Sequence, residues 1–193
     1  VWNYNKLDYG DRFCSGLLFW YHNCSMRQVS SRMWDWSLEP TASLYHTANS
    51  LEPLHAQFDY LKNTVSVVND YYRSFNNYKV IARVYDINSR KVYEESASVN
   101  LPEDGVANDV LTIRFPENIS QVHFIKLVLK DEKGKDVSSN FYWRSNDKYE
   151  GSKTLTGPAS SGFEDLNKLK AANVKLSYNC LLYTSPSPRD RTR

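Results

Sequence analysis

Side chains that could carry out chemistry are few and widely separated in this sequence. The histidines, His22, His46, His55 and His123, have no spacing that would place two of them on one metal ion, and the three cysteines recur irregularly. The sequence contains no Gly-x-Ser-x-Gly, no glycine-rich phosphate loop and no His-Glu-x-x-His. We therefore expect no metal site and no bound cofactor.

Carboxylates are the remaining candidates, because a pair of them can act as general acid and base. Asp8, Asp11, Asp35 and Glu39 lie in the first forty positions. Asp35 and Glu39 fall on or near predicted helix starts, where capping and the helix dipole already account for acidic residues. The sequence selects no acid/base pair among them.

His22 differs from the other histidines in its position. It follows Ser15–Tyr21 (SGLLFWY), a short apolar run typical of a strand buried on both faces. Functional side chains of α/β folds gather at the carboxyl ends of such strands, so His22 is a candidate site residue. We interpret His46, on a predicted helix, and His55 and His123, on predicted strands, as structural or surface residues.

The elements that must position these side chains form two zones. In residues 1–52, helical spacing follows the apolar run, from Val29 to Trp36 and again from Leu44 to Ala48, with Pro40 between the two predicted helices. The order of strand, polar loop and helices fits the last β/α unit of an α/β structure. One such unit cannot form a stable domain by itself.

Residues 53–146 predict a β-sandwich. Seven alternating segments are separated by turn signals such as Pro102–Gly105. This number of short strands in about 90 residues matches an immunoglobulin-like sandwich, without the Cys-Trp-Cys pattern of antibody domains. The fold class is therefore mainly β, and the predicted strands are Leu54–Tyr60, Thr64–Asn69, Tyr78–Asp86, Lys91–Val99, Asp109–Phe115, Gln121–Lys130 and Val137–Arg144.

After the sandwich we predict a linker over 147–173, with a short amphipathic turn in its second half, and the start of a further β domain over 174–179. Residues 180–193 change composition sharply, and Cys180–Asp190 (CLLYTSPSPRD) is similar to the translation of a transposon-end sequencing adapter. We interpret 180–193 as an artefact tail. The chain starts at Val1 without a leader, and we interpret it as part of a longer protein.

Net charge and cysteine content limit the possible partners and the possible disulfides of this protein. The formal net charge is only +2 and scattered, which argues against a nucleic-acid partner, and no apolar run is long enough to span a membrane. We interpret the cysteines as buried free thiols, and a disulfide between Cys14 and Cys24 remains the alternative.

Three stretches resemble the C-terminal half of glycoside hydrolase family two enzymes of the β-mannosidase and exo-β-D-glucosaminidase group. Gly16–Asn23 (GLLFWYHN) is similar to the eighth strand of the catalytic barrel in that family. Met33–Gln57 (MWDWSLEPTASLYHTANSLEPLHAQ) resembles the closing barrel helix. Ser138–Ser145 (SSNFYWRS) is similar to the strand that closes the following immunoglobulin-like domain.

The resemblance implies that residues 1–52 end a truncated (β/α)8 barrel. Trp20 would then stack on a pyranose at the carboxyl end of the eighth strand, and His22 or Asn23 would bind its hydroxyls. The two carboxylates of a retaining exo-β-glycosidase would lie upstream of Val1, so this chain alone would be inactive. A carbohydrate substrate, either a β-mannoside or a β-glucosaminide, and a periplasmic or secreted location are implied as well.

A second hypothesis is a non-catalytic sandwich that binds carbohydrate or mediates adhesion. Phe141, Tyr142, Trp143 and Tyr78 favour it if they form an exposed flat strip. Period-two alternation instead places Phe141 and Trp143 on one face, either in the core or at the contact with the barrel segment. A purely architectural spacer is the third possibility.

Overall fold

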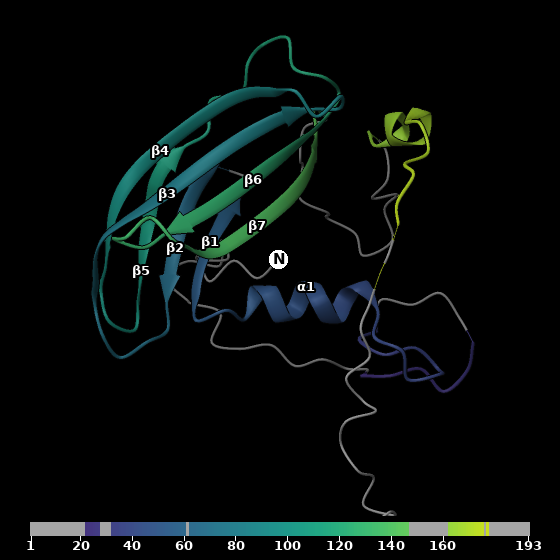
Figure 1. Ribbon diagram of the computed structural model, residues 1–193, viewed down its shortest axis with the longest axis horizontal. Helices are drawn as coiled ribbons and strands as arrows, with labels where there is room; N and C mark the ends of the chain where they lie inside the picture. Colours follow the sequence, from purple (N-terminus) through teal and green to yellow (C-terminus); the bar gives the residue numbers. More distant parts are fainter. Residues whose placement is uncertain (1–21, 28–31, 61, 147–161, 176, 178–193) are drawn as a thin grey trace, which may run out of the picture.

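The computed structural model describes residues 22–27, 32–60, 62–146, 162–175 and 177 (Figure 1). Within these residues the chain forms two antiparallel sheets, one α-helix and one short 3-10 helix. The elements are α1 (Ala42–Ser50), β1 (Leu54–Asp59), β2 (Thr64–Asn69), β3 (Phe75–Asp86), β4 (Lys91–Leu101), β5 (Gly105–Thr112), β6 (Val122–Lys130), β7 (Asp136–Ser145) and η1 (Glu164–Lys168).

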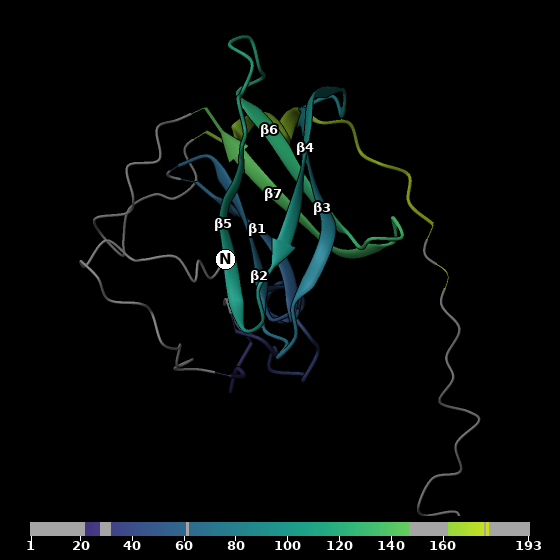
Figure 2. The same ribbon diagram turned by 90° about the vertical axis from the view of Figure 1, so that its left-hand side faces the viewer.

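The two sheets pack face to face as a sandwich. One has the strand order β1-β2-β5 and the other β4-β3-β6-β7, and every pairing between neighbours is antiparallel. Figure 2 shows the two sheets as separate layers. The mainly-β prediction is confirmed, and each of the seven predicted strands corresponds to one strand of the structure.

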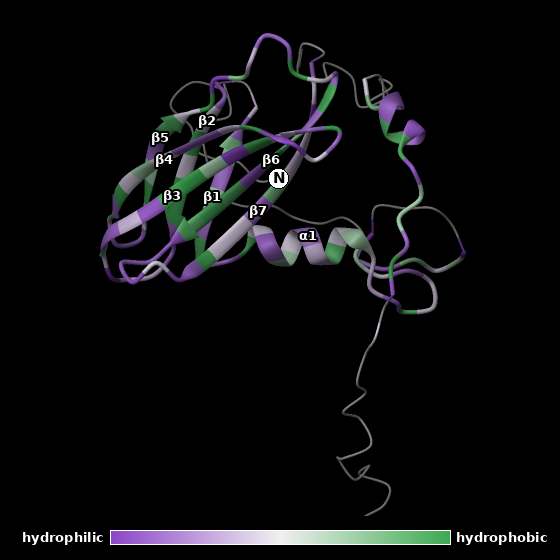
Figure 3. Ribbon diagram, turned by 45° about the horizontal axis from the view of Figure 1, so that its top comes forward, coloured by the Kyte–Doolittle hydropathy of each residue, from purple (hydrophilic) through white to green (hydrophobic). Residues whose placement is uncertain are grey.

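Alternating side chains form the core between the sheets. Val80, Ala82 and Val84 of β3 are fully buried, and so are Ile125 and Leu127 of β6. Figure 3 shows that β3 and β6 carry both hydrophobic and hydrophilic positions. Each buried aliphatic side chain of this size stabilises the fold by about 1.5–3 kcal/mol, so the sandwich holds together without a disulfide.

Strand β5 starts four residues earlier than its pattern predicts. Asp109 has a φ of 51° inside the strand, and the register with β2 shifts between Val65 and Val67. The Asp109 N–H donates to Ser66 Oγ (3.1 Å), and the Asp109 carboxylate accepts a hydrogen bond from Thr64 Oγ1 (2.6 Å). This bulge interrupts the alternation of side chains, which is why the strand was predicted only after it.

The first predicted helix, Val29 to Trp36, is wrong where the structure describes it. Residues 32–40 form turns and single bridges instead. Asp35 Oδ1 accepts hydrogen bonds from the backbone N–H groups of Ser37 (2.8 Å) and Glu39 (2.9 Å), and Leu38 has a φ of 64°. The side chain of Asp35 thus satisfies backbone donors that a helix would use differently. The hydrogen bond from the Ser37 hydroxyl (2.8 Å), followed by that from the Glu39 N–H, lowers the pKa of Asp35.

The second predicted helix is α1, which contains Leu44 and Ala48 and extends by two residues at each end. Thr41 is its N-cap and accepts a hydrogen bond from the Ser43 N–H (3.2 Å), so Pro40 precedes the cap and is not in the first helical turn. None of the α1 residues is buried. Figure 1 shows α1 beside the end of β7, outside the sandwich.

The last β/α unit of a barrel is not found in the described part of the chain. Its predicted strand, Ser15–Tyr21, lies outside the described residues. The described residues next to it make only a single parallel bridge, between Asn23 and Trp34. The division at residue 52 therefore stays a prediction.

The C-terminal predictions have mixed outcomes. The short amphipathic turn is present as η1, Glu164–Lys168, within the predicted linker. Residues 174, 175 and 177 have no regular secondary structure, so the strand predicted for 174–179 is not found there. Most of the linker and the tail 180–193 lie outside the described residues. No helix among the residues described is long and apolar enough to cross a bilayer.

Candidate functional site

Of the three residues predicted to contact a sugar, the structure describes two. Trp20 lies outside the described residues. His22 and Asn23 are both exposed, and their backbones are held by Trp34 and Arg32: the Trp34 N–H donates to the His22 carbonyl (3.3 Å), and Arg32 Nη1 donates to the Asn23 carbonyl (2.9 Å). Both side chains are accessible to a ligand, and their sugar-binding role stays a prediction.

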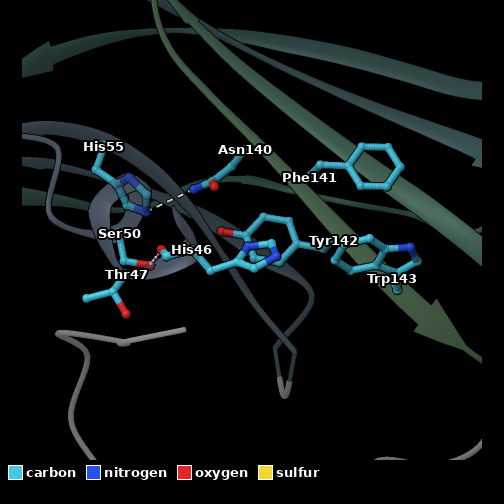
Figure 4. A pocket seen from close by; sticks show the side chains of 8 residues that line it. All are labelled: His46, Thr47, Ser50, His55, Asn140, Phe141, Tyr142 and Trp143. Carbon is cyan, nitrogen blue, oxygen red and sulfur yellow. Dashed lines mark hydrogen bonds between the residues drawn. The ribbon is translucent and has the colours of Figure 1, made fainter. Parts of the chain in front are cut away.

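A different site lies between the helix and the second sheet, and we call it the α1–β7 groove. It is an open cavity of about 280 Å³. Its lining residues are His46, Thr47 and Ser50 of α1, His55 of β1, and Asn140, Phe141, Tyr142 and Trp143 of β7 (Figure 4).

The aromatic wall of the groove overturns one sequence prediction. Phe141 and Trp143 are each 45% exposed, whereas Tyr142 between them is only 3% exposed. Placing Phe141 and Trp143 in the core is therefore wrong, because the inward-facing residue of this stretch is Tyr142. The alternative placement, in contact with residues 1–52, fits better: the His46 ring lies edge-on to Trp143, with centroids 6.0 Å apart.

The exposed rings do not form a flat strip. Phe141 stacks on Phe124 of β6, with centroids 5.5 Å apart and planes 24° apart. Trp143 meets Phe141 at the same centroid distance but at an angle of 82°. The two β7 rings therefore form a corner. Tyr78, the fourth aromatic of the sugar-binding hypothesis, packs partly buried against Phe75 instead (5.3 Å).

A polar network holds the floor of the groove. Asn140 Nδ2 donates to the Ala56 carbonyl (2.8 Å) and to His55 Nε2 (2.9 Å). His55 therefore accepts at Nε2 and is neutral, with its proton on Nδ1, which lies 3.9 Å from Glu52 Oε2. Glu52 Oε2 also accepts from Ser138 Oγ (2.9 Å), so the network joins the start of β1 to β7.

Electrostatics agree with a neutral imidazole. Burial lowers the pKa of His55, and this effect exceeds the opposing attraction of the Glu52 carboxylate. The buried hydroxyl of Tyr142 accepts a hydrogen bond from the Phe58 N–H (3.2 Å), and burial raises the pKa of Tyr142. Both groups thus bridge the two sheets in uncharged form.

The groove offers aromatic rings, hydroxyl groups and an amide, which are groups suited to binding a ligand. No carboxylate is among the described residues that line it. Within the described residues, no cluster of three histidine, cysteine or acidic side chains could hold a metal ion. Of the other histidines, His123 is buried, as its structural interpretation predicts. Cys24 is buried too, and Cys14 lies outside the described residues.

Sequence reasoning missed the groove for an identifiable reason. Phe141, Tyr142 and Trp143 are all aromatic, so polarity does not distinguish the inward residue from its neighbours. Asn140 shares the inward side of β7 with Tyr142, and its polar side chain is satisfied there by His55 and the Ala56 carbonyl, which the sequence does not reveal. Nothing in the sequence indicates that His46 lines the groove, because only the packing of α1 against β7 places it there.

Comparisons with known proteins agree with the sandwich. Residues 62–149 match the family model of the mannosidase Ig/CBM-like domain. The chain is 26% identical over 133 residues to an exo-β-D-glucosaminidase of Streptomyces avermitilis, covering 68% of this chain and 15% of that protein. It is 24% identical over 196 residues to an exo-β-D-glucosaminidase of Hypocrea virens, covering 98% of this chain and 22% of that protein.

A solved structure has the same fold. The crystal structure of the Amycolatopsis orientalis exo-chitosanase CsxA superposes with a TM-score of 0.67 at 22% identity, covering 76% of this chain and 17% of that one. The chain thus spans less than a quarter of the length of each of these relatives. Over residues 62–149 the chain is therefore similar to the mannosidase Ig/CBM-like domain, and the curated relatives that it matches are exo-β-D-glucosaminidases.

Proposed function

We propose that this chain is part of a retaining exo-β-glycosidase that acts on β-glucosaminides, with β-mannosides as the other candidate substrate. The observation that carries the proposal is the extent of the similarity. The match to the exo-β-D-glucosaminidase of Hypocrea virens covers 98% of this chain, whereas the family model of the sandwich covers only residues 62–149. Likeness to such enzymes thus includes residues ahead of the sandwich.

In this proposal residues 1–52 form one wall of the sugar pocket and the sandwich is an accessory domain. Trp20 stacks on the apolar face of the sugar, and His22 and Asn23 bind its hydroxyl groups. Retaining hydrolysis needs two carboxyl groups about 5–5.5 Å apart, one as nucleophile and one as acid/base. The α1–β7 groove has none, so we assign both to the part of the enzyme upstream of Val1.

The test is to extend the reading frame upstream in the source DNA and to express the extended protein. We expect a barrel with two glutamate side chains at strand ends, and turnover of nitrophenyl β-D-glucosaminide above that of nitrophenyl β-mannoside. Trp20→Ala in the extended protein is expected to raise KM at least tenfold, while Tyr72→Ala, at an 87% exposed position of the sandwich, serves as the control. An upstream sequence without a barrel, or no turnover of either substrate, would overturn the proposal.

One observation favours a second candidate, a sandwich that binds carbohydrate without cleaving it. Phe141 and Trp143 are half-exposed at an open cavity. The two functions are compatible, because an accessory domain can bind a sugar at a distance from a catalytic pocket.

A further inference from the structure

We propose that the α1–β7 groove is a non-catalytic binding site for the end of a neutral oligosaccharide. The proposal rests on the second candidate function above, which it makes specific, and it does not depend on the enzymatic one, because it is argued only from the groove. Half-exposed aromatic rings, fixed hydrogen-bonding groups and the absence of charge meet in one cavity.

The aromatic corner provides the apolar contact. Trp143 and Phe141 are each 45% exposed and meet edge to face at 82°, so part of each ring stays open at the groove that they line. A pyranose has one face of C–H groups that packs on an aromatic ring, and a second ring at right angles limits how the sugar can turn. Phe124 stacks behind Phe141 and fixes its plane.

The polar groups are oriented before any ligand arrives. Both protons of Asn140 Nδ2 are used, on the Ala56 carbonyl and on His55, which leaves Oδ1 as a fixed acceptor. On the opposite wall, Ser50 Oγ donates to the His46 carbonyl (2.8 Å), so its oxygen is left to accept from a ligand hydroxyl. The Thr47 hydroxyl lies on the same wall (Figure 4). Groups held in place in this way reduce the entropy lost on binding.

Charge and size select the ligand class. None of the described residues that line the groove is a lysine, arginine, aspartate or glutamate, which favours an uncharged ligand. The volume of about 280 Å³ is at the lower end of small-molecule sites, which suits one or two sugar units and not a long chain. A polypeptide helix would need a longer and flatter apolar surface than a corner of two rings.

The experiment titrates the full chain with three disaccharides in a calorimeter. The neutral probes are mannobiose and N,N′-diacetylchitobiose, and the cationic probe is the glucosamine disaccharide. We expect saturable binding of a neutral probe with a Kd on the order of 1 mM, a usual strength for a small site. No saturation by either neutral probe up to about 20 mM would overturn the proposal. If the cationic probe bound more tightly than both neutral probes, the assignment of the groove to neutral oligosaccharides would be wrong.

Variants locate the site. Trp143→Ala is expected to weaken binding at least tenfold, and Thr47→Ala, on a solvent-facing helix, about threefold. Trp36→Ala is the matched control, because Trp36 is 47% exposed but lies outside the groove, and it should bind as the wild type does. Equal losses in Trp36→Ala and Trp143→Ala would contradict the assignment. Since none of these titrations measures hydrolysis, their failure leaves the proposed enzymatic function untouched.

Discussion

Tyr142 shows how one residue can connect the core of the sandwich with its surface site. Its ring packs in the core near Phe58, with centroids 5.9 Å apart, while its two neighbours in the chain point to the groove. Its hydroxyl satisfies the Phe58 N–H on the facing sheet. Burial without such a bond would leave a backbone donor unpaired, which is costly.

Tyr142→Phe is therefore expected to lower the free energy of unfolding by about 1–3 kcal/mol, since the Phe58 N–H loses its partner. Urea unfolding of the full chain measures the change. Tyr72→Phe is the control, because Tyr72 is 87% exposed, and it should change stability by less than about 0.5 kcal/mol. Equal stability of Tyr142→Phe and the wild type would show that water replaces the hydroxyl.

His55 makes stability depend on pH. Burial lowers its pKa in the folded state below the value of about 6.5 expected in the unfolded chain. Below that pH the unfolded state binds more protons, so the contribution of His55 is present above pH 6.5 and is lost as the pH falls through the folded pKa. We expect His55→Gln to flatten the fall in unfolding free energy between pH 7 and pH 5, by at most about 1.4 kcal/mol per pH unit.

A second buried histidine, His123, provides a parallel test of the same effect. Burial also lowers the pKa of His123, so His123→Gln should flatten the same curve in the same direction. Unfolding curves at several pH values would measure both variants. An unchanged slope in both would contradict the neutral state assigned to these rings.

Among the elements, α1 is the weakest part of the site. It has no buried residue, so its stability depends on its N-cap and on contacts such as that of His46 with Trp143. Helices this short are marginal without packing. The sandwich strands, in contrast, pack on a continuous core.

We expect backbone amides of α1 to exchange with solvent much faster than those of β6. Thr41→Ala removes the N-cap acceptor and should speed α1 exchange about fivefold, corresponding to about 1 kcal/mol, without changing β6. Thr41→Ser keeps the acceptor and should exchange as the wild type does. Amides in α1 as slow as those of β6 would contradict this picture.

On the scale of the whole molecule, the described residues form a two-sheet sandwich with one helix and one groove beside it. The sandwich has two sheets and a shared core, whereas the described residues ahead of it contain one helix and two single bridges. This difference agrees with the proposal that the latter are completed by a larger enzyme.

The chain alone is expected to hydrolyse neither nitrophenyl β-mannoside nor nitrophenyl β-D-glucosaminide. Both assays would be run at high protein concentration, with absorbance followed for hours, and with a heat-treated sample as the control. Turnover above that control, retained after further purification, would place a carboxylate pair within this chain.

Much of the sandwich could be predicted from the sequence, because strand alternation such as Val80, Ala82 and Val84 is a local signal of burial on one face. The predicted helix from Val29 to Trp36 failed because apolar spacing does not report that the Asp35 side chain can take the backbone donors. The β5 boundary failed because a bulge at Asp109 breaks the period. His22 and Asn23 were chosen from resemblance, and their role is still to be measured.

By itself the sequence determined the seven strands, their core and the family that they resemble, since these depend on residues close together in the chain. Only the tertiary structure decided which aromatic of β7 faces inward and that α1 borders the outward ones. The physical reason is that a groove is made by residues about 90 positions apart, and no local pattern encodes the packing of one element against another.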